Sequence, residues 1–150
     1  MAIDLSDPIY HDEDAARKYL EDCRWPDGPV CPHCGVVDKS RAVAGASMGP
    51  GWFYCEACKD KFTVRTGTVY ERSHVAWHKW VLAFRLIASS KKGMSAHQLS
   101  RALSVTYKTG WFIAHRVREA MSVPDPERFG GKDKVVEGDE TFTAPANMYR

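Results

Sequence analysis

The sequence predicts an α+β protein built from small modules, and three observations carry this prediction. Two pairs of closely spaced cysteines lie in the N-terminal half and are separated by twenty residues. Short runs rich in β-forming residues lie between and after these pairs, and three stretches with helical apolar spacing follow. A chain of 150 residues allows one ordinary domain or a few small modules. We expect modules at residues 1–29, 30–70, 71–122 and 123–150.

Residues 12–23 are expected to form the first helix. The residues at helical spacing are Ala15, Ala16, Tyr19, Leu20 and Cys23. Acids at residues 12–14 suit the N-terminal end of a helix, and the Trp-Pro-Asp-Gly-Pro run at 25–29 ends it. Cys23 has apolar neighbours and is expected to be a small buried side chain. The acidic start is interpreted as a solvated helix face.

The four paired cysteines predict a structural metal site. They form a C-x2-C-x20-C-x2-C pattern, which is close to the spacing typical of zinc sites: Cys31, Cys34, Cys55 and Cys58. Four thiolates fill a tetrahedral shell and leave no open position for a substrate. We therefore favour structural zinc over a disulfide framework, and we expect His33 to lie outside the metal shell. A module of this size buries too little apolar surface to fold unaided, so the metal supplies folding energy.

The strands of the cysteine module are expected at residues 41–44 and 52–54, on either side of a Gly/Ser/Pro turn. The alternating run at residues 61–66 is expected to be the returning strand. Together with the metal site, these strands predict a zinc ribbon at residues 30–70.

Two helices are expected next. Ser73 is expected to cap the first, which carries a broad apolar stripe to Ser89 and includes Trp77 and Trp80 as core residues. The Ser-Ala-His-Gln sequence at residues 95–98 is a capping-box pattern that opens the second helix.

A third helix is expected at residues 106–121, after a turn at residues 104–105. Its predicted inner face consists of Trp111, Ala114, Val117 and Met121. Two helices joined by a tight turn, with polar and basic residues outward on the second, are typical of a helix-turn-helix. A three-helix unit that does not bind DNA remains an alternative.

The charge is distributed unevenly. The whole chain has a net charge of +2, but residues 61–121 carry eleven Lys/Arg and two acids. A basic module attracts polyanions, which favours a nucleic-acid partner. Residues 1–4 lack a basic start and an apolar core, and no apolar run is long enough to span a membrane. With reduced cysteines, these features predict a cytoplasmic protein without a membrane partner.

Several motifs together resemble the N-terminal part of bacterial insertion-sequence transposases that carry a zinc ribbon ahead of a DDE-type, RNase H-like catalytic domain. The motifs are Arg-Trp-Pro-Asp-Gly at 24–28, Cys-Pro-His-Cys-Gly at 31–35, Phe-Thr-Val-Arg-Thr-Gly-Thr at 62–68, Ala-Ser-Ser-Lys-Lys-Gly-Met-Ser-Ala-His-Gln-Leu at 88–99, Val-Thr-Tyr-Lys-Thr-Gly-Trp-Phe at 105–112 and Val-Glu-Gly-Asp-Glu-Thr at 136–141. The resemblance covers nearly the whole chain.

The resemblance implies that Asp139 is the first acid of a catalytic triad, on the first strand of an RNase H-like domain. Phosphoryl chemistry of this kind uses two divalent ions, implied here to be Mg²⁺, held by acids from several strands. Only eleven residues follow Asp139, and the sequence at 142–147 departs from the family pattern. We therefore expect a truncated transposase without catalytic activity of its own.

The resemblance and the helix-turn-helix pattern together predict double-stranded DNA as the partner, specifically the ends of an insertion sequence, in a nucleoid-associated protein. The N-terminal residues of a recognition helix reach base edges, which here are Thr106, Tyr107, Lys108 and Thr109. The expected phosphate contacts are Arg65, Lys91, Lys92, Arg116 and Arg118. A homo-oligomer or a full-length transposase is a possible further partner.

Three alternatives remain open at this point. The first is a stand-alone DNA-binding regulator built from the same zinc ribbon and helix-turn-helix. The second is a nuclease subunit whose Asp139 completes a site on another chain. The third is a zinc-stabilised protein-interaction module, which the acidic N-terminal helix favours.

Overall fold

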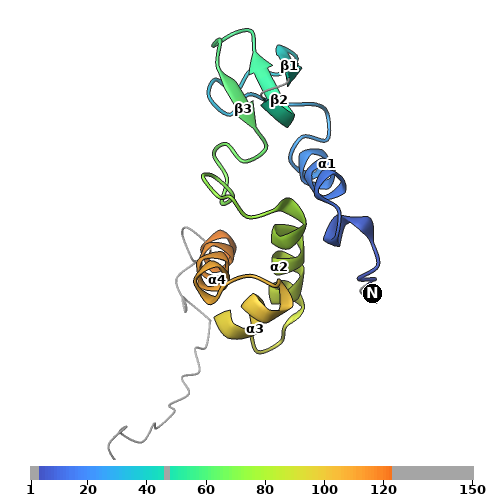
Figure 1. Cartoon of the computed structure of the whole chain (residues 1–150). Coiled ribbons are helices and arrows are strands. Elements are labelled where there is room, and N and C mark those ends of the chain that lie inside the picture. Colours follow the sequence, from blue (N-terminus) through green and yellow to red (C-terminus); the bar gives the residue numbers. More distant parts are fainter. Residues whose placement is uncertain (1–3, 46–47, 123–150) are drawn as a thin grey trace, which may run out of the picture.

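The computed structural model describes residues 4–45 and 48–122 of the chain (Figure 1). The elements in order are η1 (Pro8–Tyr10), α1 (Glu13–Arg24), β1 (Ser40–Gly45), β2 (Met48–Cys55), β3 (Lys61–Thr63), α2 (Trp77–Ser89), α3 (Ala96–Ala102) and α4 (Tyr107–Met121). The sheet lies at one end of the molecule and α2, α3 and α4 lie at the other, with α1 packed beside α2 (Figure 1). None of the helices in the described ranges is long and apolar enough to cross a membrane. The α+β architecture in small modules is confirmed.

Helix α1 begins as its sequence predicts, because the Asp12 carboxylate accepts a hydrogen bond from the Ala15 amide at 2.7 Å. Ala16 is fully buried on its inner face. Cys23, however, is exposed, so the prediction of a buried thiol was wrong. The reason is tertiary: near its C-terminal end α1 lines an open groove of about 400 Å³, shared with Phe84 and Arg85 of α2.

The three strands form an antiparallel sheet in which β2 lies between β1 and β3. Phe53 in β2 is the Cα partner of both Ala42 in β1 and Phe62 in β3. Strand β3 ends at Thr63 and is shorter than the sequence predicts. The Thr63 amide donates to the Thr66 hydroxyl at 3.1 Å, so a turn replaces the continued ladder.

The first hydrophobic core joins the sheet to α1 and to the start of α2. Trp25 makes edge-to-face contacts with Phe53 at 5.4 Å and with Phe62 at 5.7 Å between ring centroids. Cys31 is fully buried in the same core, which also contains Trp77 from α2. The ribbon, α1 and the first turn of α2 are therefore packed as one body.

The second core lies among α2, α3 and α4. Its fully buried members are Trp80, Ala83, Leu99, Ile113 and Val117. Tyr70, in the segment that precedes α2, packs against both cores and meets Trp77 and Trp80 edge-to-face at 5.4 Å and 5.3 Å. One tyrosine ring thus connects the ribbon to the helical unit.

The start of α2 differs from the sequence prediction. The helix begins at Trp77, and its N-cap residue Ala76 offers no side-chain hydrogen bond. The carboxylate of Glu13 in α1 accepts a hydrogen bond from the Trp77 amide at 2.7 Å and therefore caps the N-terminus of α2. Ser73 is not the cap; its hydroxyl instead accepts from Nε1 of Trp80 at 3.3 Å.

The inner face of α4 also differs from the prediction in two positions. Trp111 and Met121 are 50% and 54% exposed, although both were expected inside. The buried face instead runs through Gly110, Ile113, Ala114 and Val117. The reason is the close approach of α3 to Gly110, which turns the helix so that Trp111 points toward solvent.

We predict that Gly110→Ala lowers the melting temperature of the zinc-loaded protein. A Cβ at this position would lie 2.8 Å from the Cβ of Ser100 and 3.0 Å from the carbonyl oxygen of Ala96. Overpacking of this kind costs roughly 1–3 kcal/mol, whereas helix propensity alone would stabilise the protein by about 1 kcal/mol. Thermal unfolding shows whether the melting temperature of Gly110→Ala falls, as overpacking predicts, or rises, as helix propensity alone predicts. Gly49→Ala is the control, because a Cβ there meets nothing within 4 Å; a higher melting temperature for Gly110→Ala contradicts the packing.

Candidate metal centre and nucleic-acid interface

The two cysteine pairs lie in knuckles with matching backbone hydrogen bonds. The Gly35 amide donates to the Cys31 carbonyl at 2.8 Å, and the Lys59 amide donates to the Cys55 carbonyl at 3.0 Å. Gly35 and Lys59 both have left-handed backbone conformations, with φ of 70° and 63°. Each knuckle therefore turns its two thiols toward the other knuckle.

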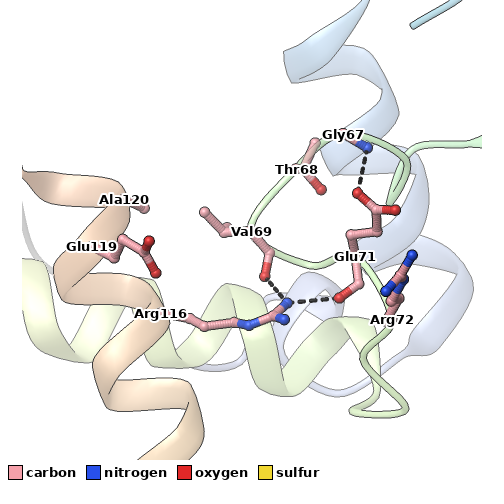
Figure 2. Close-up of a pocket in the computed structure, with 8 residues that line it drawn as sticks. All are labelled: Gly67, Thr68, Val69, Glu71, Arg72, Arg116, Glu119 and Ala120. Atoms are coloured by element: carbon pink, nitrogen blue, oxygen red, sulfur yellow. Dashed lines mark hydrogen bonds between the residues drawn. The ribbon is translucent and has the colours of Figure 1, made fainter. Parts of the chain in front are cut away.

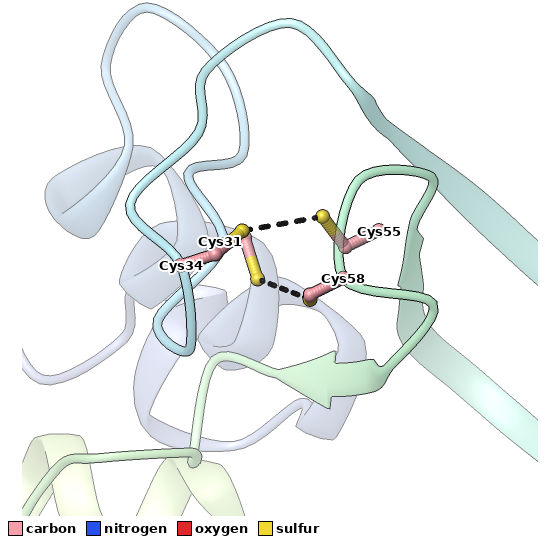
Figure 3. A group of neighbouring side chains, drawn as sticks. All are labelled: Cys31, Cys34, Cys55 and Cys58. Atoms are coloured by element: carbon pink, nitrogen blue, oxygen red, sulfur yellow. Dashed lines mark hydrogen bonds between the residues drawn. The ribbon is translucent and has the colours of Figure 1, made fainter.

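The four sulfur atoms converge in the space between the knuckles (Figure 3). All four lie within 4.8 Å of one another. The Cys31–Cys58 and Cys34–Cys55 sulfur pairs are each 3.6 Å apart. A tetrahedral site with Zn–S bonds of about 2.3 Å requires sulfur separations of about 3.8 Å, whereas a disulfide requires about 2.05 Å. The arrangement fits a structural zinc ion and excludes disulfides between these pairs.

Backbone amides favour the thiolate form of Cys55, whereas burial and the neighbouring thiols raise the pKa of Cys34 and Cys58. The backbone N–H of Cys58 points at the Cys55 sulfur and is the main reason that the pKa of Cys55 is lowered to about 6; the Ala57 amide adds to this effect. His33 lies on the outside of the first knuckle, with Nε2 3.8 Å from the Asp60 carboxylate. Its expected position outside the metal shell agrees with this geometry.

Helices α3 and α4 form a helix-turn-helix. The Ser95 and Gln98 side chains make the predicted capping box at the start of α3. Ser104 has a left-handed φ of 50° in the connecting turn, and the Val105 amide donates to the Ser100 carbonyl at 3.0 Å. The turn thus has a fixed geometry, and α4 starts from a defined position.

One face of α4 is exposed along the length of the helix. Five of its exposed residues form what we call the outer ridge: Tyr107, Lys108, Trp111, His115 and Arg118; the exposed acid Glu119 follows His115 by one turn. Tyr107 stacks on His97 of α3 with ring centroids 4.2 Å apart, and Trp111 packs on His115 at 4.1 Å. The ridge therefore combines the cations Lys108 and Arg118 with the aromatic rings of Tyr107 and Trp111.

Thr106 and Thr109, which were expected to reach base edges, lie at the N-terminal end of α4 with their hydroxyls in contact. Thr106 is the N-cap, and its Oγ1 accepts from the Thr109 amide at 3.3 Å. The two hydroxyl oxygens are 2.9 Å apart. Their first role is to start the helix, which places Lys108 in the exposed first turn.

Two of the expected phosphate contacts, Arg65 and Arg116, are engaged inside the molecule. The Arg65 guanidinium donates to the carbonyls of Ser73 and, at 3.1 Å, Val75, and burial lowers its pKa. Arg116 donates to the carbonyls of Val69 and Glu71 at 2.6 Å and 2.7 Å (Figure 2). Both side chains hold the segment between the ribbon and α2, so we leave them out of the proposed interface.

The remaining basic candidates lie near the C-terminal half of α4. Lys91 and Lys92 are exposed in the turn after α2. Arg118 donates to the carbonyl of Met94 at 3.1 Å, which ties α4 to the end of the same turn. Asp139, the expected catalytic acid, lies outside the described residues.

Sequence reasoning missed two residues of the ridge, Trp111 and His115, as interface candidates. Trp111 was assigned to the core because large aromatic residues at helical spacing are usually buried. The signal that identifies it is Gly110, whose lack of a side chain marks the face that approaches another helix. His115 follows Trp111 by one turn, which places both on the same face.

Comparisons with known proteins show two similarities. Residues 11–61 match the family model described as the transposase zinc-ribbon domain, of the IS1595 type. The chain is also 32% identical, over 118 residues, to an uncharacterized protein in transposable element ISH50 of Halobacterium salinarum. Residues 11–61 are thus similar to transposase zinc-ribbon domains, and most of the chain is similar to a protein from a transposable element. The match covers 79% of the chain and 39% of the relative, so the chain spans about two fifths of that protein's length. No solved structure matches the chain.

The family match and the sulfur geometry agree on structural zinc, and they define a prediction. Cys55→Ser should abolish zinc binding and unfold the ribbon, because zinc coordination contributes roughly 10 kcal/mol or more to folding in comparable small sites. Metal analysis and circular dichroism of the purified protein measure both effects. Cys23→Ser is the matched control, since that thiol is exposed and lies outside the cluster. Full zinc content in Cys55→Ser overturns the assignment.

Proposed function

We propose that this protein is the DNA-binding part of a transposase and recognises the duplex ends of an insertion sequence through α4. The observation that carries the proposal is the outer ridge of α4, with its exposed cations and its half-exposed tryptophan. Contiguous exposed apolar surface rimmed by polar groups marks interaction sites, and Tyr107 and Trp111, one turn apart and about half exposed, provide such surface. The relationship to transposases supports DNA as the partner.

The charge of the helical unit supports the same partner. The one acid of α4 within the described residues is Glu119, near its C-terminal end, whereas the first turn carries Lys108. Residues 61–121 carry eleven Lys/Arg and two acids. Phosphate neutralisation supplies most of the non-specific affinity of DNA-binding proteins, so this charge gives the unit a general attraction to duplex DNA.

The ridge also has the chemistry required for sequence recognition. Lys108, in the first exposed turn, has the donor that suits the acceptor edge of guanine in the major groove. Trp111, one turn further on, offers an apolar surface that suits a thymine methyl group. Arg118, Lys91 and Lys92 then meet phosphates at the other end of the helix. We therefore assign contacts with DNA bases to the N-terminal half of α4 and contacts with the DNA backbone to its C-terminal half.

The role in transposition follows from the relationship and is part of the proposal. End binding brings a transposase to its substrate, and two ends are brought together when bound chains associate with one another or with a full-length transposase. A regulator of the same element would use the same surface and the same zinc ribbon. The binding experiments below therefore test the feature that both roles share.

We predict that Lys108→Ala reduces specific binding more than non-specific binding. A good base contact contributes about 1–3 kcal/mol of discrimination, which is roughly a 5- to 150-fold loss for the best duplex. The measurement is a titration of a duplex selected from a random pool, beside a scrambled duplex of the same length. Lys18→Ala, an exposed lysine on α1, removes the same charge far from α4. Equal losses in both variants contradict the proposal.

We predict that Trp111→Ala lowers affinity for the selected duplex and leaves the fold intact. Its ring is 50% exposed, so its removal should change stability by about 0.5 kcal/mol or less. Thermal unfolding checks the fold, and duplexes in which each thymine in turn is replaced by deoxyuracil check the contact. Wild-type protein should lose affinity at one replaced thymine, and Trp111→Ala should be insensitive to that replacement. Unchanged affinity in Trp111→Ala contradicts this role.

A further inference from the structure

A groove beside the N-terminal half of α4 is a second strongly basic surface. It has a volume of about 600 Å³ and lies between the segment before α2, the first turn of α2 and the start of α4. Its lining residues are Arg72, Ser73, His74, Val75, Ala76, Lys79, Val105, Lys108, Thr109 and Phe112. The DNA-binding candidates described above include only Lys108 and Thr109 from this groove.

The charges of the groove have one sign. The cations Arg72, Lys79 and Lys108 line it together with the imidazole of His74, and none of the described residues that line it is acidic. The acids of neighbouring segments, Glu13 and Glu71, do not line the groove and accept hydrogen bonds from backbone amides. Glu13 accepts from the Trp77 amide, and the Glu71 carboxylate accepts from the Gly67 amide at 3.2 Å. The groove therefore presents cations above an apolar floor, which suits a phosphodiester chain.

The groove lies directly alongside the outer ridge, because Lys108 belongs to both. Lys79 joins the groove to the helix-turn-helix turn, with Nζ 3.4 Å from the Ser104 carbonyl oxygen. Phe112, which faces the groove, is adjacent in sequence to Trp111 on the ridge. The two surfaces thus adjoin, and a single ligand can contact the ridge of α4 and lie in the groove at the same time.

The geometry of duplex DNA fits an arrangement in which the basic groove lies beside the outer ridge of α4. The major groove is about 12 Å wide and is bounded on both sides by phosphate backbones. A helix that enters it therefore has one backbone on each side. On one side of α4 lies α3, and on the other lies the basic groove.

We propose that this groove binds the phosphodiester backbone of one DNA strand that borders the major groove occupied by α4. Arg72 and Lys79 each contact a phosphate, and His74 contributes a hydrogen bond to the backbone between them. This inference rests on the proposed function and assigns the DNA contacts of residues 72–79. It makes the segment between the ribbon and α2 part of the interface.

The test compares the salt dependence of DNA binding in a double variant, Arg72→Gln with Lys79→Gln, and in the wild-type protein. Each phosphate contact contributes about 0.9 to the log–log slope of affinity against salt, so the slope should become shallower by about 1.8. The control is Lys18→Gln with Lys39→Gln, which removes the same charge at exposed positions away from the groove. Zinc content and thermal unfolding confirm that each variant is folded. The charge-preserving variant, Arg72→Lys with Lys79→Arg, should restore the wild-type slope.

Ethylation interference on the selected duplex locates the contacts. Neighbouring phosphates of one strand, next to the base pairs protected by α4, should block wild-type binding when they are ethylated. The same ethylations should no longer affect the double variant. An unchanged slope and interference pattern in the double variant overturn the groove assignment, while loss of discrimination in Lys108→Ala would still uphold the role of α4. Absence of any salt-dependent DNA binding by the wild-type protein overturns both.

Discussion

Tetrahedral coordination of one zinc ion by two matched knuckles is the constraint on which the rest of the structure depends. Strand β3 has three residues and the sheet has three strands, which is close to the lower limit for independent stability. The first cysteine of each knuckle, Cys31 and Cys55, is fully buried in the core that holds Trp25 and Phe62. Zinc binding therefore fixes the ends of the sheet and closes the aromatic core at the same time.

That core extends beyond the ribbon and fixes the helical unit. Trp77 belongs to the ribbon core and to α2, and Tyr70 contacts both cores. Arg65 lies over the ring of Trp77 at 4.2 Å while it binds the carbonyls of Ser73 and Val75. Arg116 holds the same connecting segment from the side of α4. The segment at residues 64–76 is thus packed on both sides, which positions its basic residues beside α4.

The zinc site and the helix-turn-helix could be predicted from the sequence because both depend on local spacing. Two residues between cysteines fix a knuckle, and the Ser95–Gln98 pair fixes the start of α3. Apart from the early end of β3, which a local turn explains, the failures involve contacts between separate elements. Ser73 was predicted to cap α2, but Glu13 binds the Trp77 amide instead. Glu13 is sixty-four residues from Trp77 in the sequence. Trp111 is exposed because α3 approaches Gly110; the glycine marks this contact, but the apolar periodicity of α4 does not. Arg65 and Arg116 resemble surface cations in the sequence, but backbone carbonyls bind them, eight and ten residues away for Arg65 and 47 and 45 residues away for Arg116.

The central claim is that α4 and the groove beside it form one DNA-binding surface. Backbone amide chemical shifts, measured by NMR during titration with the selected duplex, test this claim most directly. We predict that the largest changes occur in the first two turns of α4 and in residues 72–79, with smaller changes at Lys91 and Lys92. Changes confined to the ribbon or to α1, with α4 unaffected, would contradict the account.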